Sequence, residues 1–270
     1  MVSERVRMFL GTAMTPLSQQ MQNLSSDFAR QGYVTLPNVV SKMRLAALTK
    51  ELRDEYARVR ENGELFSGGG TISGHLNCFP GVQSRFVYDE LEQHGVIDLV
   101  RTLSPIAKGM PNIGCNLNLP KSSAQNPHVD GSTNSAFLII NVAPIDTTLN
   151  NGAMEVAPGT HLRELKFWQY ALSGKPTFRM CMNAGDVIVR TSTLWHRGMP
   201  NLSDAIRPML AYTWENGGSD LSDPYAAHGG RITLLPNRYS HSLAGRLRER
   251  AFASLPALGM SYLFVRSVFQ

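Results

Sequence analysis

The sequence predicts a mainly β fold of the sandwich or jelly-roll type, with α-helices packed outside it. From residue 112 onward, short apolar runs alternate with turn residues, which is typical of antiparallel strands in such folds. Before residue 112, apolar side chains recur at the spacing of amphipathic helices. The chain of 270 residues contains no linker-like stretch, so we expect residues 1–270 to form a single domain.

The N-terminal part predicts one helix and one strand before the next helix begins. Residues 17–31 carry apolar side chains at helical spacing. Gly32 is expected to end this helix, because glycine readily adopts a left-handed backbone. Residues 33–37 then have the β-branched and aromatic character of a short strand.

Two further helices are predicted before the β region. The first spans 42–60, with Ser41 as its N-cap, and the second spans 89–103. Residues 66–81 between them predict a loop. The three glycines at 68–70 lack the spacing of a phosphate-binding loop and follow no clear strand, so we expect a flexible loop that borders a pocket.

The expected jelly-roll core covers about residues 112–214. After it, residues 217–270 form a C-terminal segment of mixed loop and helix, with a helix expected at 241–254. Each strand is predicted from a short apolar run bounded by turn residues. The six runs are 113–119, 136–142, 153–157, 177–182, 186–191 and 208–214.

The composition excludes several classes of protein. An apolar content of 43% and a charged content of 17% are typical of a globular chain rather than a disordered one. The net charge of +5 is modest, and the basic residues at 231–250 are too sparse for a nucleic-acid surface. No stretch approaches the ~20 apolar residues that a membrane span needs. We therefore expect neither nucleic acid nor membrane among the partners.

The cysteines indicate the cellular compartment. Cys78, Cys115 and Cys181 are far apart in the sequence and form no CxxC pair. Their odd number and wide spacing argue against a disulfide framework and against a structural zinc site. The N-terminal apolar run is too short for a signal peptide. We therefore expect a reducing, cytoplasmic location. The sequence leaves the oligomeric state open between a monomer and a homodimer.

The main chemical signal is the tripeptide His128-Val129-Asp130. In an extended chain, side chains at i and i+2 point to the same face, so an imidazole and a carboxylate are directed together. The second signal is His196, which follows the apolar run 186–191 and precedes a Gly-Met-Pro-Asn turn. Two histidines and one carboxylate on a β scaffold form a facial triad, which binds Fe(II) on one face and leaves three positions open.

Arg207 extends this pattern, because it lies at the start of the predicted strand that follows His196. The open positions of a triad suit a bidentate 2-oxo acid and O₂. A dicarboxylate that chelates iron at one end needs a cation at the other, and a guanidinium matches a carboxylate through two parallel hydrogen bonds. Each feature alone has a simpler explanation, since a strand-end histidine is more often a surface or core residue and a lone arginine is usually a surface charge. Their combination favours a metal site.

Several motifs carry a resemblance to a known family. Gly-Tyr-Val and Leu-Pro-Asn-Val-Val lie within 32–40, and Asn-Gly-Ala-Met-Glu-Val-Ala-Pro-Gly-Thr-His spans 151–161. Gly185-Asp186 opens the strand that leads to the second histidine. With the spacing from that histidine to the arginine, these motifs resemble the phytanoyl-CoA dioxygenase-like branch of the Fe(II)/2-oxoglutarate oxygenases. The resemblance covers roughly residues 24–214.

The resemblance implies a double-stranded β-helix, or jelly roll, with helices outside. It implies His128, Asp130 and His196 as ligands of Fe(II), Arg207 as the anchor of 2-oxoglutarate, and O₂ as the oxidant. It also decides between two chemistries. Related halogenases have a small residue in place of the carboxylate, so Asp130 favours hydroxylation or another C–H oxidation.

Two further residues are candidates for contact with 2-oxoglutarate. Asn141 stands near a position where family members place a cofactor-contacting side chain, and a buried asparagine bonded to backbone explains it equally well. Thr133 follows the metal motif and either donates to the co-substrate or finishes a turn. Gly198 stands where a co-substrate-binding hydroxyl is sometimes found, which puts that contact in doubt. We assign His161 to a structural turn.

The function expected is a dioxygenase that oxidises a C–H bond of a small organic molecule in natural-product metabolism and releases succinate and CO₂. The alternative substrate for the same chemistry is a fatty acyl-CoA. A jelly-roll binding protein with a silent site and a hydrolytic zinc enzyme, which would not need Arg207, are the alternatives from other classes. Substrate choice is expected from the segments with the least pattern, 64–81, 120–127 and 217–240.

Overall fold

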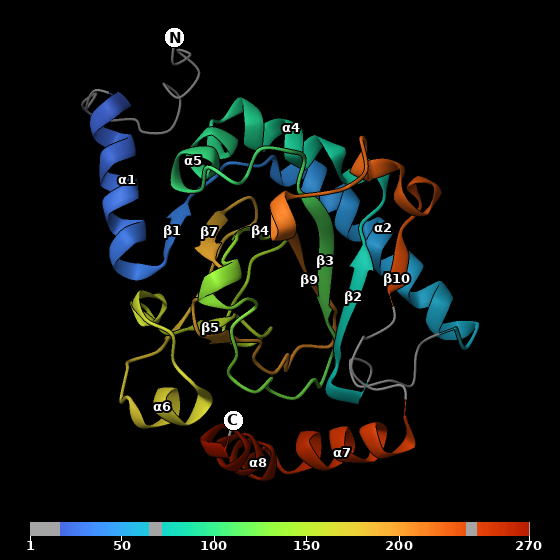
Figure 1. The fold of residues 1–270 in the computed structure, drawn as a ribbon. Coiled ribbons are helices and arrows are strands. Elements are labelled where there is room, and N and C mark those ends of the chain that lie inside the picture. Colours follow the sequence, from blue (N-terminus) through green and yellow to red (C-terminus); the bar gives the residue numbers. More distant parts are fainter. Residues whose placement is uncertain (1–16, 65–71, 236–241, 270) are drawn as a thin grey trace.

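The fold consists of two antiparallel sheets with helices on their outer faces (Figure 1). The computed structural model describes residues 17–64, 72–235 and 242–269. Within these residues, the larger sheet has the strand order β1-β7-β4-β9-β3-β2-β10 and the smaller one β6-β5-β8. The larger sheet comprises β1 (Tyr33–Leu36), β2 (His75–Phe79), β3 (Asn112–Asn118), β4 (Leu138–Val142), β7 (Val187–Thr191), β9 (Arg207–Thr213) and β10 (Thr233–Leu235). The smaller sheet comprises β5 (Glu155–Val156), β6 (Phe178–Arg179) and β8 (His196–Arg197).

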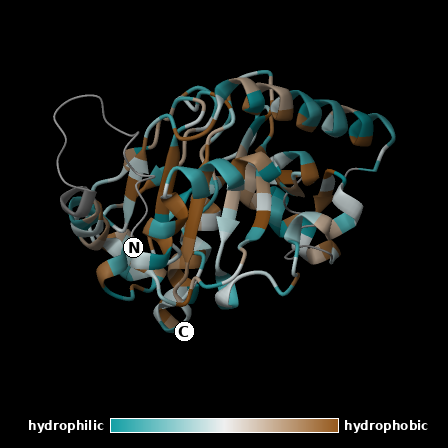
Figure 2. Cartoon of the chain, turned by 90° about the horizontal axis from the view of Figure 1, so that it is seen from above, coloured by the Kyte–Doolittle hydropathy of each residue, from teal (hydrophilic) through white to brown (hydrophobic). Residues whose placement is uncertain are grey.

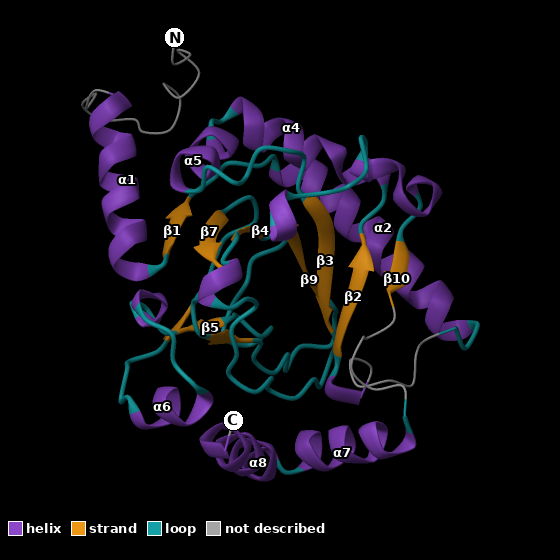
Figure 3. Cartoon of the chain, in the orientation of Figure 1, coloured by secondary structure: helices purple, strands orange, loops and turns teal. Residues whose placement is uncertain are grey.

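The helices lie on two sides of this β core, as Figure 3 shows. On one side, helices α2, α4 and α5 bury leucine, isoleucine and valine side chains in a cluster with one face of the larger sheet. On the other side, α6 and α8 pack together through aromatic and apolar side chains. The helices are α1 (Leu17–Gln31), α2 (Lys42–Glu61), α4 (Arg85–Gln93), α5 (Val96–Leu103), α6 (Phe167–Leu172), α7 (Leu243–Ser254) and α8 (Pro256–Phe269).

The period of two along the strands decides which side chains face the site. In β9, Leu210 and Tyr212 join the cluster under the helices, so Arg207, Met209 and Ala211 point to the opposite, inner face. The strands at the centre of Figure 2 are coloured largely as hydrophobic, with hydrophilic residues on the helices around them. Polar side chains on the inner face of the central strands therefore depart from this pattern.

The predicted strands from 112 onward are all present, and the mainly β class is confirmed. The predicted helix at 89–103 is wrong in one respect, because Gly95 adopts a left-handed backbone (φ 74°) and separates α4 from α5. The expected loop at 66–81 is also wrong in part. Residues 65–71 lie outside the described residues, but His75–Phe79 forms β2. Two of its inner-facing residues, His75 and Asn77, are polar, which hid the strand from a search for apolar runs.

The helix expected at 42–60 is present as α2, but Ser41 does not cap it through its side chain. Its backbone N–H instead donates to Glu90 Oε2 of α4 at 2.7 Å, which ties the start of α2 to a neighbouring helix. The C-terminal segment holds α7, as expected, and also α8, which begins at a proline suited to the first turn of a helix. No single helix among the described ranges is long and apolar enough to cross a membrane, and α7 and α8, which pass only as a pair, meet at a 117° bend.

Gly185 joins the start of β7 to the segment before α2. Its carbonyl accepts from the N–H groups of Val39 and Val40, at 2.9 and 3.1 Å, and its own N–H donates to Ala143 at 2.9 Å. The φ of Gly185 is +87°, and a Cβ there would overlap the carbonyl oxygen of Val40.

We expect Gly185→Ala to lower the free energy of unfolding by roughly 2–4 kcal/mol, measured by urea denaturation. Gly63→Ala is the control, because its φ is +69° but a Cβ there would meet nothing; equal losses would contradict the account.

Candidate metal centre

Two chain segments bring the predicted ligands together. His128 and His196 form an antiparallel bridge, in which each N–H donates to the other's carbonyl at 2.9 and 3.0 Å. The N–H of Asp130 donates to Ser192 O at 2.8 Å, which holds the carboxylate segment against the same loop. In register, His196 lies opposite Val156 of β5, so the smaller sheet fixes its position. The structure thus places all three predicted ligands side by side.

Both histidines present the same nitrogen to the site. Nδ1 of His128 lies 2.8 Å from the carbonyl of Asn126, and Nδ1 of His196 lies 2.9 Å from the carbonyl of Leu194. A carbonyl only accepts, so each Nδ1 carries a proton, and in the neutral form of each imidazole it is Nε2 that has the lone pair. The backbone two residues upstream therefore orients each imidazole and assigns its tautomer, as a second coordination shell does for metal-binding histidines.

The donor atoms fit a divalent ion. His196 Nε2 lies 3.4 Å from Asp130 Oδ2, and His128 Nε2 lies 3.8 Å from Asp130 Oδ1. One ligand atom from each residue lies within 4.8 Å of the other two. Bonds of about 2.0–2.2 Å to one ion require donors at roughly this separation. The His196 side chain is 6% exposed but that of Asp130 is 29% exposed, so the cluster has one protected and one accessible side.

The charges around the cluster are set for metal binding. Burial favours the neutral form of the Asp130 carboxyl, but His196, Arg190 and His128 outweigh burial and hold its pKa well below its usual range. Burial, assisted by Arg190, lowers the pKa of His196 to about 3. At neutral pH the site therefore offers an ionised carboxylate and a neutral imidazole at His196, which are the forms that bind metal.

Arg190 is a neighbour that the sequence did not single out. It lies on β7 with a side chain 6% exposed, and its Nη1 is 2.8 Å from Asp130 Oδ2. The contact is an ion pair without the alignment of a good hydrogen bond. Arg190 Nε donates to Asn141 Oδ1 at 3.0 Å, and Asn141 Nδ2 donates to Leu210 O at 3.3 Å. Asn141 therefore contacts the metal cluster through Arg190, and its direct contact with 2-oxoglutarate stays a prediction.

Arg207 lies at the buried end of the inner face. It is 4% exposed, and its guanidinium donates to the carbonyls of Gly152, at 3.0 Å, and Asn151, at 3.4 Å. Within the described part of the chain, no carboxylate lies within 4.0 Å of it. Burial lowers the pKa of Arg207 to about 10, so it remains charged at neutral pH. A buried cation bonded only to neutral carbonyls retains capacity for an anion.

His75 and Gln125 fill the space beside Gly198. A Cβ on Gly198 would lie 2.8 Å from His75 Cε1 and 2.7 Å from Gln125 Oε1. Gln125 Oε1 also accepts from the Gly198 N–H at 2.8 Å. A larger residue at 198 would therefore require both side chains to shift. Sequence reasoning missed both residues, because neither lies in a recognisable motif.

The buried His75 predicts a pH dependence of stability. Its Nε2 lies 2.9 Å from Ser123 O, and burial lowers its pKa to about 4. An unfolded histidine has a pKa near ~6.5, so between these values the unfolded chain binds the extra proton and stability falls as the pH is lowered. We expect His75→Gln to reduce the slope of unfolding free energy against pH by up to ~1.4 kcal/mol per pH unit in this window. Urea denaturation of metal-free protein measures it; equal slopes for both proteins would contradict the buried neutral state.

Thr133 has no described contact with His128, Asp130 or His196. It is exposed, and its hydroxyl donates to Glu164 Oε2 at 2.8 Å. Its predicted contact with 2-oxoglutarate therefore has no support from the geometry. His161 matches its structural assignment, because its Nε2 lies 3.1 Å from the carbonyl of Ala29 in the last turn of α1.

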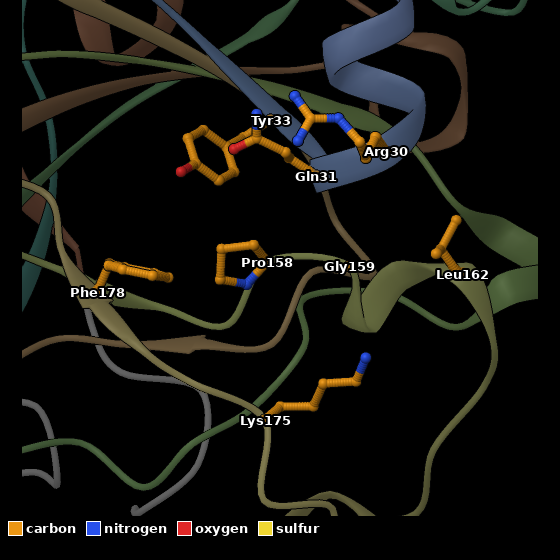
Figure 4. A pocket seen from close by; sticks show the side chains of 8 residues that line it. All are labelled: Arg30, Gln31, Tyr33, Pro158, Gly159, Leu162, Lys175 and Phe178. Atoms are coloured by element: carbon orange, nitrogen blue, oxygen red, sulfur yellow. The ribbon is translucent and has the colours of Figure 1, made fainter.

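A hollow of about 590 Å³ lies on the surface near the end of α1 (Figure 4). It shares no residue with the metal cluster and is open to solvent. It is lined by Arg30, Gln31, Tyr33, Pro158, Gly159, Leu162, Lys175 and Phe178.

Comparisons with known proteins identify the family of this chain. Residues 28–209 match the model of the phytanoyl-CoA dioxygenase (PhyH) family. The chain is 28% identical over 122 residues to "Dioxygenase lolE1" of Epichloe uncinata, a match that spans 41% of this chain and 48% of that protein. The chain thus spans about half the length of this curated relative.

Solved structures share the fold. The epimerase SnoN, solved in complex with Fe³⁺, alpha ketoglutarate and nogalamycin RO, has a TM-score of 0.55, with 18% identity over 82% of this chain and 97% of that one. The carbocyclase SnoK from nogalamycin biosynthesis has a TM-score of 0.52, with 18% identity over 83% of this chain and 100% of that one. At this identity the likeness shows the fold, a jelly roll of the kind that the sequence predicted.

Proposed function

Because the chain belongs to the phytanoyl-CoA dioxygenase family, we propose that it is an Fe(II)- and 2-oxoglutarate-dependent dioxygenase that oxidises a C–H bond of a small organic molecule. The observation that carries this proposal is Arg207. A triad alone also suits a hydrolytic metal site, but a buried arginine without a carboxylate partner suits an anionic co-substrate. Since Ala211 pairs with Asn141, Arg207 shares the inner face of the sheet with the residue that supports the cluster.

The roles of the residues follow from their chemistry. His128 and His196, through Nε2, and Asp130, through its carboxylate, would hold Fe(II). Bound there, iron supplies the activation of O₂ that couples decarboxylation of 2-oxoglutarate to substrate oxidation. Arg207 would bind the distal carboxylate of 2-oxoglutarate. His75 is neutral and adds no second positive charge beside Arg207, so the distal carboxylate of 2-oxoglutarate would pair with the Arg207 guanidinium alone.

The reaction balances with these components. Substrate C–H, 2-oxoglutarate and O₂ give substrate C–OH, succinate and CO₂. One oxygen atom of O₂ enters the alcohol and the other enters the new carboxylate of succinate. The ionised Asp130 and the neutral His196 are already in their metal-binding forms at neutral pH, so neither has to lose a proton before the metal binds.

We place the substrate over the open end of the inner face. Arg207 and Asn118 at one end are buried, whereas Asn116 and Ala211 further along the same strands are partly exposed. Gly114 lies opposite Ala211 in register, and a Cβ on Gly114 would meet no atom within 4 Å. The two small residues leave room above the sheet, on the side away from the arginine.

The side chains at this open end favour a neutral, oxygen-rich substrate. Asn77 and Asn116 lie opposite each other in β2 and β3, and their amides offer donors and acceptors to hydroxyl and carbonyl groups. The inward-facing residues of β2 and β3 around this end include no lysine or arginine, as the phosphates of a CoA ester would need. Arg190, on the same face in β7, is buried and paired with Asp130. A natural product is therefore the proposed substrate class, and a fatty acyl-CoA is the second candidate. SnoN and SnoK, which share the fold, come from nogalamycin biosynthesis.

Turnover under ¹⁸O₂ tests the function. Iron-loaded protein with 2-oxoglutarate would be screened against a library of polyketides and glycosides, and separately against fatty acyl-CoA esters, with succinate and product masses as readouts. We expect one ¹⁸O atom in succinate and substrate-dependent succinate formation with members of the first library. Gly114→Phe should suppress that stimulation and leave 2-oxoglutarate binding unchanged. Succinate formation only with acyl-CoA esters would replace the proposed substrate class.

A further inference from the structure

We infer that Arg190, held by Asn141, is a positioning residue that fixes the Asp130 carboxylate and places a permanent positive charge beside the metal. This inference rests on the proposed function only in taking the metal to be iron. It concerns two residues of the inner face, neither of which the triad pattern requires. Its basis is a chain of contacts across three strands, β7, β4 and β9.

The contacts leave Arg190 little freedom. It is 5% exposed, and its Nε donates to Asn141 Oδ1 at 3.0 Å. Asn141 is itself 7% exposed and is anchored through Nδ2 to the carbonyl of Leu210. A buried guanidinium held at Nε by an anchored amide cannot turn away without breaking that bond in a place that water does not reach. The strand pair therefore fixes where the positive charge stands.

The fixed guanidinium acts on one end of Asp130. Arg190 Nη1 lies 2.8 Å from Oδ2, while no described side chain or N–H hydrogen-bonds Oδ1. The Asp130 side chain is 29% exposed, so without this contact its carboxylate could rotate towards solvent. The arginine thus holds the carboxylate inward, beside the two imidazoles. Before a metal binds, the charge of the Asp130 carboxylate is balanced by the charge of the Arg190 guanidinium.

A permanent cation next to iron acts differently on its two oxidation states. Fe(III) carries one more positive charge than Fe(II), so repulsion from Arg190 raises the free energy of the ferric site more. Because a guanidinium is a permanent cation, this bias is constant. The expected result is a site that keeps iron ferrous between turnovers. The affinity for divalent metal is a weaker guide, because loss of repulsion and loss of orientation have opposite effects on it.

Three variants separate charge from orientation. Arg190→Gln removes the charge, and at a fixed solution potential we expect about a tenfold or larger rise in the ratio of ferric to ferrous protein. Arg190→Lys keeps the charge but loses the planar fork, so we expect a nearly wild-type ratio and an altered visible spectrum of the Co(II) form. Asn141→Ser removes the acceptor of Arg190 Nε. It should alter the Co(II) spectrum in the same direction as Arg190→Lys, but to a smaller extent.

Arg197→Gln is the matched control. Arg197 is next to His196 in the sequence, but its Nε donates to Glu155 at 2.7 Å and it has no described contact with the cluster. It should leave both the ratio and the spectrum unchanged. An unchanged ratio in folded, iron-bound Arg190→Gln would overturn the electrostatic role. If that variant does not fold, an unchanged Co(II) spectrum in Arg190→Lys would overturn the positioning role. Failure of the wild-type protein to bind iron would instead overturn the proposed function.

Discussion

Replacement of His196 by alanine is expected to abolish tight Fe(II) binding while leaving the fold intact. His196 supplies one of three ligands, and substitution of residues that merely support metal ligands already costs about 10–100-fold in affinity. Loss of a ligand should therefore weaken binding by more than about 100-fold. Anaerobic titration with Fe(II), followed by equilibrium dialysis and iron analysis, measures the change.

The fold of this variant should survive for a specific reason. His196 is neutral in the folded protein, and its Nδ1 contact is with a carbonyl only two residues away. Removing it costs packing but leaves no charged group without a partner, since Asp130 keeps Arg190. Thermal unfolding of the metal-free protein should shift by roughly 2–4 °C. His161→Ala is the control, because this imidazole contacts the end of α1; iron affinity retained in His196→Ala would refute the ligand assignment.

Replacement of Arg207 by alanine is expected to produce the second large effect, on 2-oxoglutarate. Truncation of one partner of a buried, hydrogen-bonded charge pair costs about 2–5 kcal/mol. We expect a loss of that size in the binding free energy of 2-oxoglutarate to the Fe(II) protein, measured by anaerobic calorimetry. Fe(II) affinity itself should change little, because Arg207 contacts the carbonyls of Asn151 and Gly152 and no ligand of the triad.

Arg179→Ala provides the matched control for this variant. Arg179 also donates to backbone carbonyls, those of Ala153 at 2.8 Å and Leu149 at 3.4 Å, but it lies in β6 of the smaller sheet. Both variants therefore lose hydrogen bonds to backbone carbonyls, but only Arg207→Ala loses the proposed anchor of 2-oxoglutarate. Equal 2-oxoglutarate dissociation constants for wild type and Arg207→Ala would contradict the anchor role. An equal weakening in Arg179→Ala would assign the effect to backbone disturbance instead.

The sequence contained enough information for most of the strands and for the three residues of the triad. Asp130 and His128 are two residues apart in an extended chain, so their common direction follows from strand geometry. His196 comes at the end of an apolar run, where a strand end is expected. The bridge between His128 and His196 is a long-range pairing that the sequence analysis did not predict, although it combined the two histidines with Asp130 in one site.

The parts that could not be predicted have a common cause. Strand β2 has His75 and Asn77 on its inner face, and these polar residues interrupt the apolar pattern used to find strands. Arg190 lies in a run that reads as an ordinary buried strand, so nothing local shows that it meets Asp130. His75 and Arg190 both lie on the inner face of the larger sheet. Side chains that serve a site depart from the pattern of the core, and their partners come from distant parts of the chain.

The most direct test of the central claim is the anaerobic visible spectrum of the protein with Fe(II), with 2-oxoglutarate, and with both. The account predicts a weak charge-transfer band that appears only when both are present, because a 2-oxo acid chelates iron through the open positions of the triad. The band should require a higher 2-oxoglutarate concentration in Arg207→Ala. Absence of the band from folded wild-type protein with iron bound would contradict the co-substrate site, and with it the assignment as a dioxygenase.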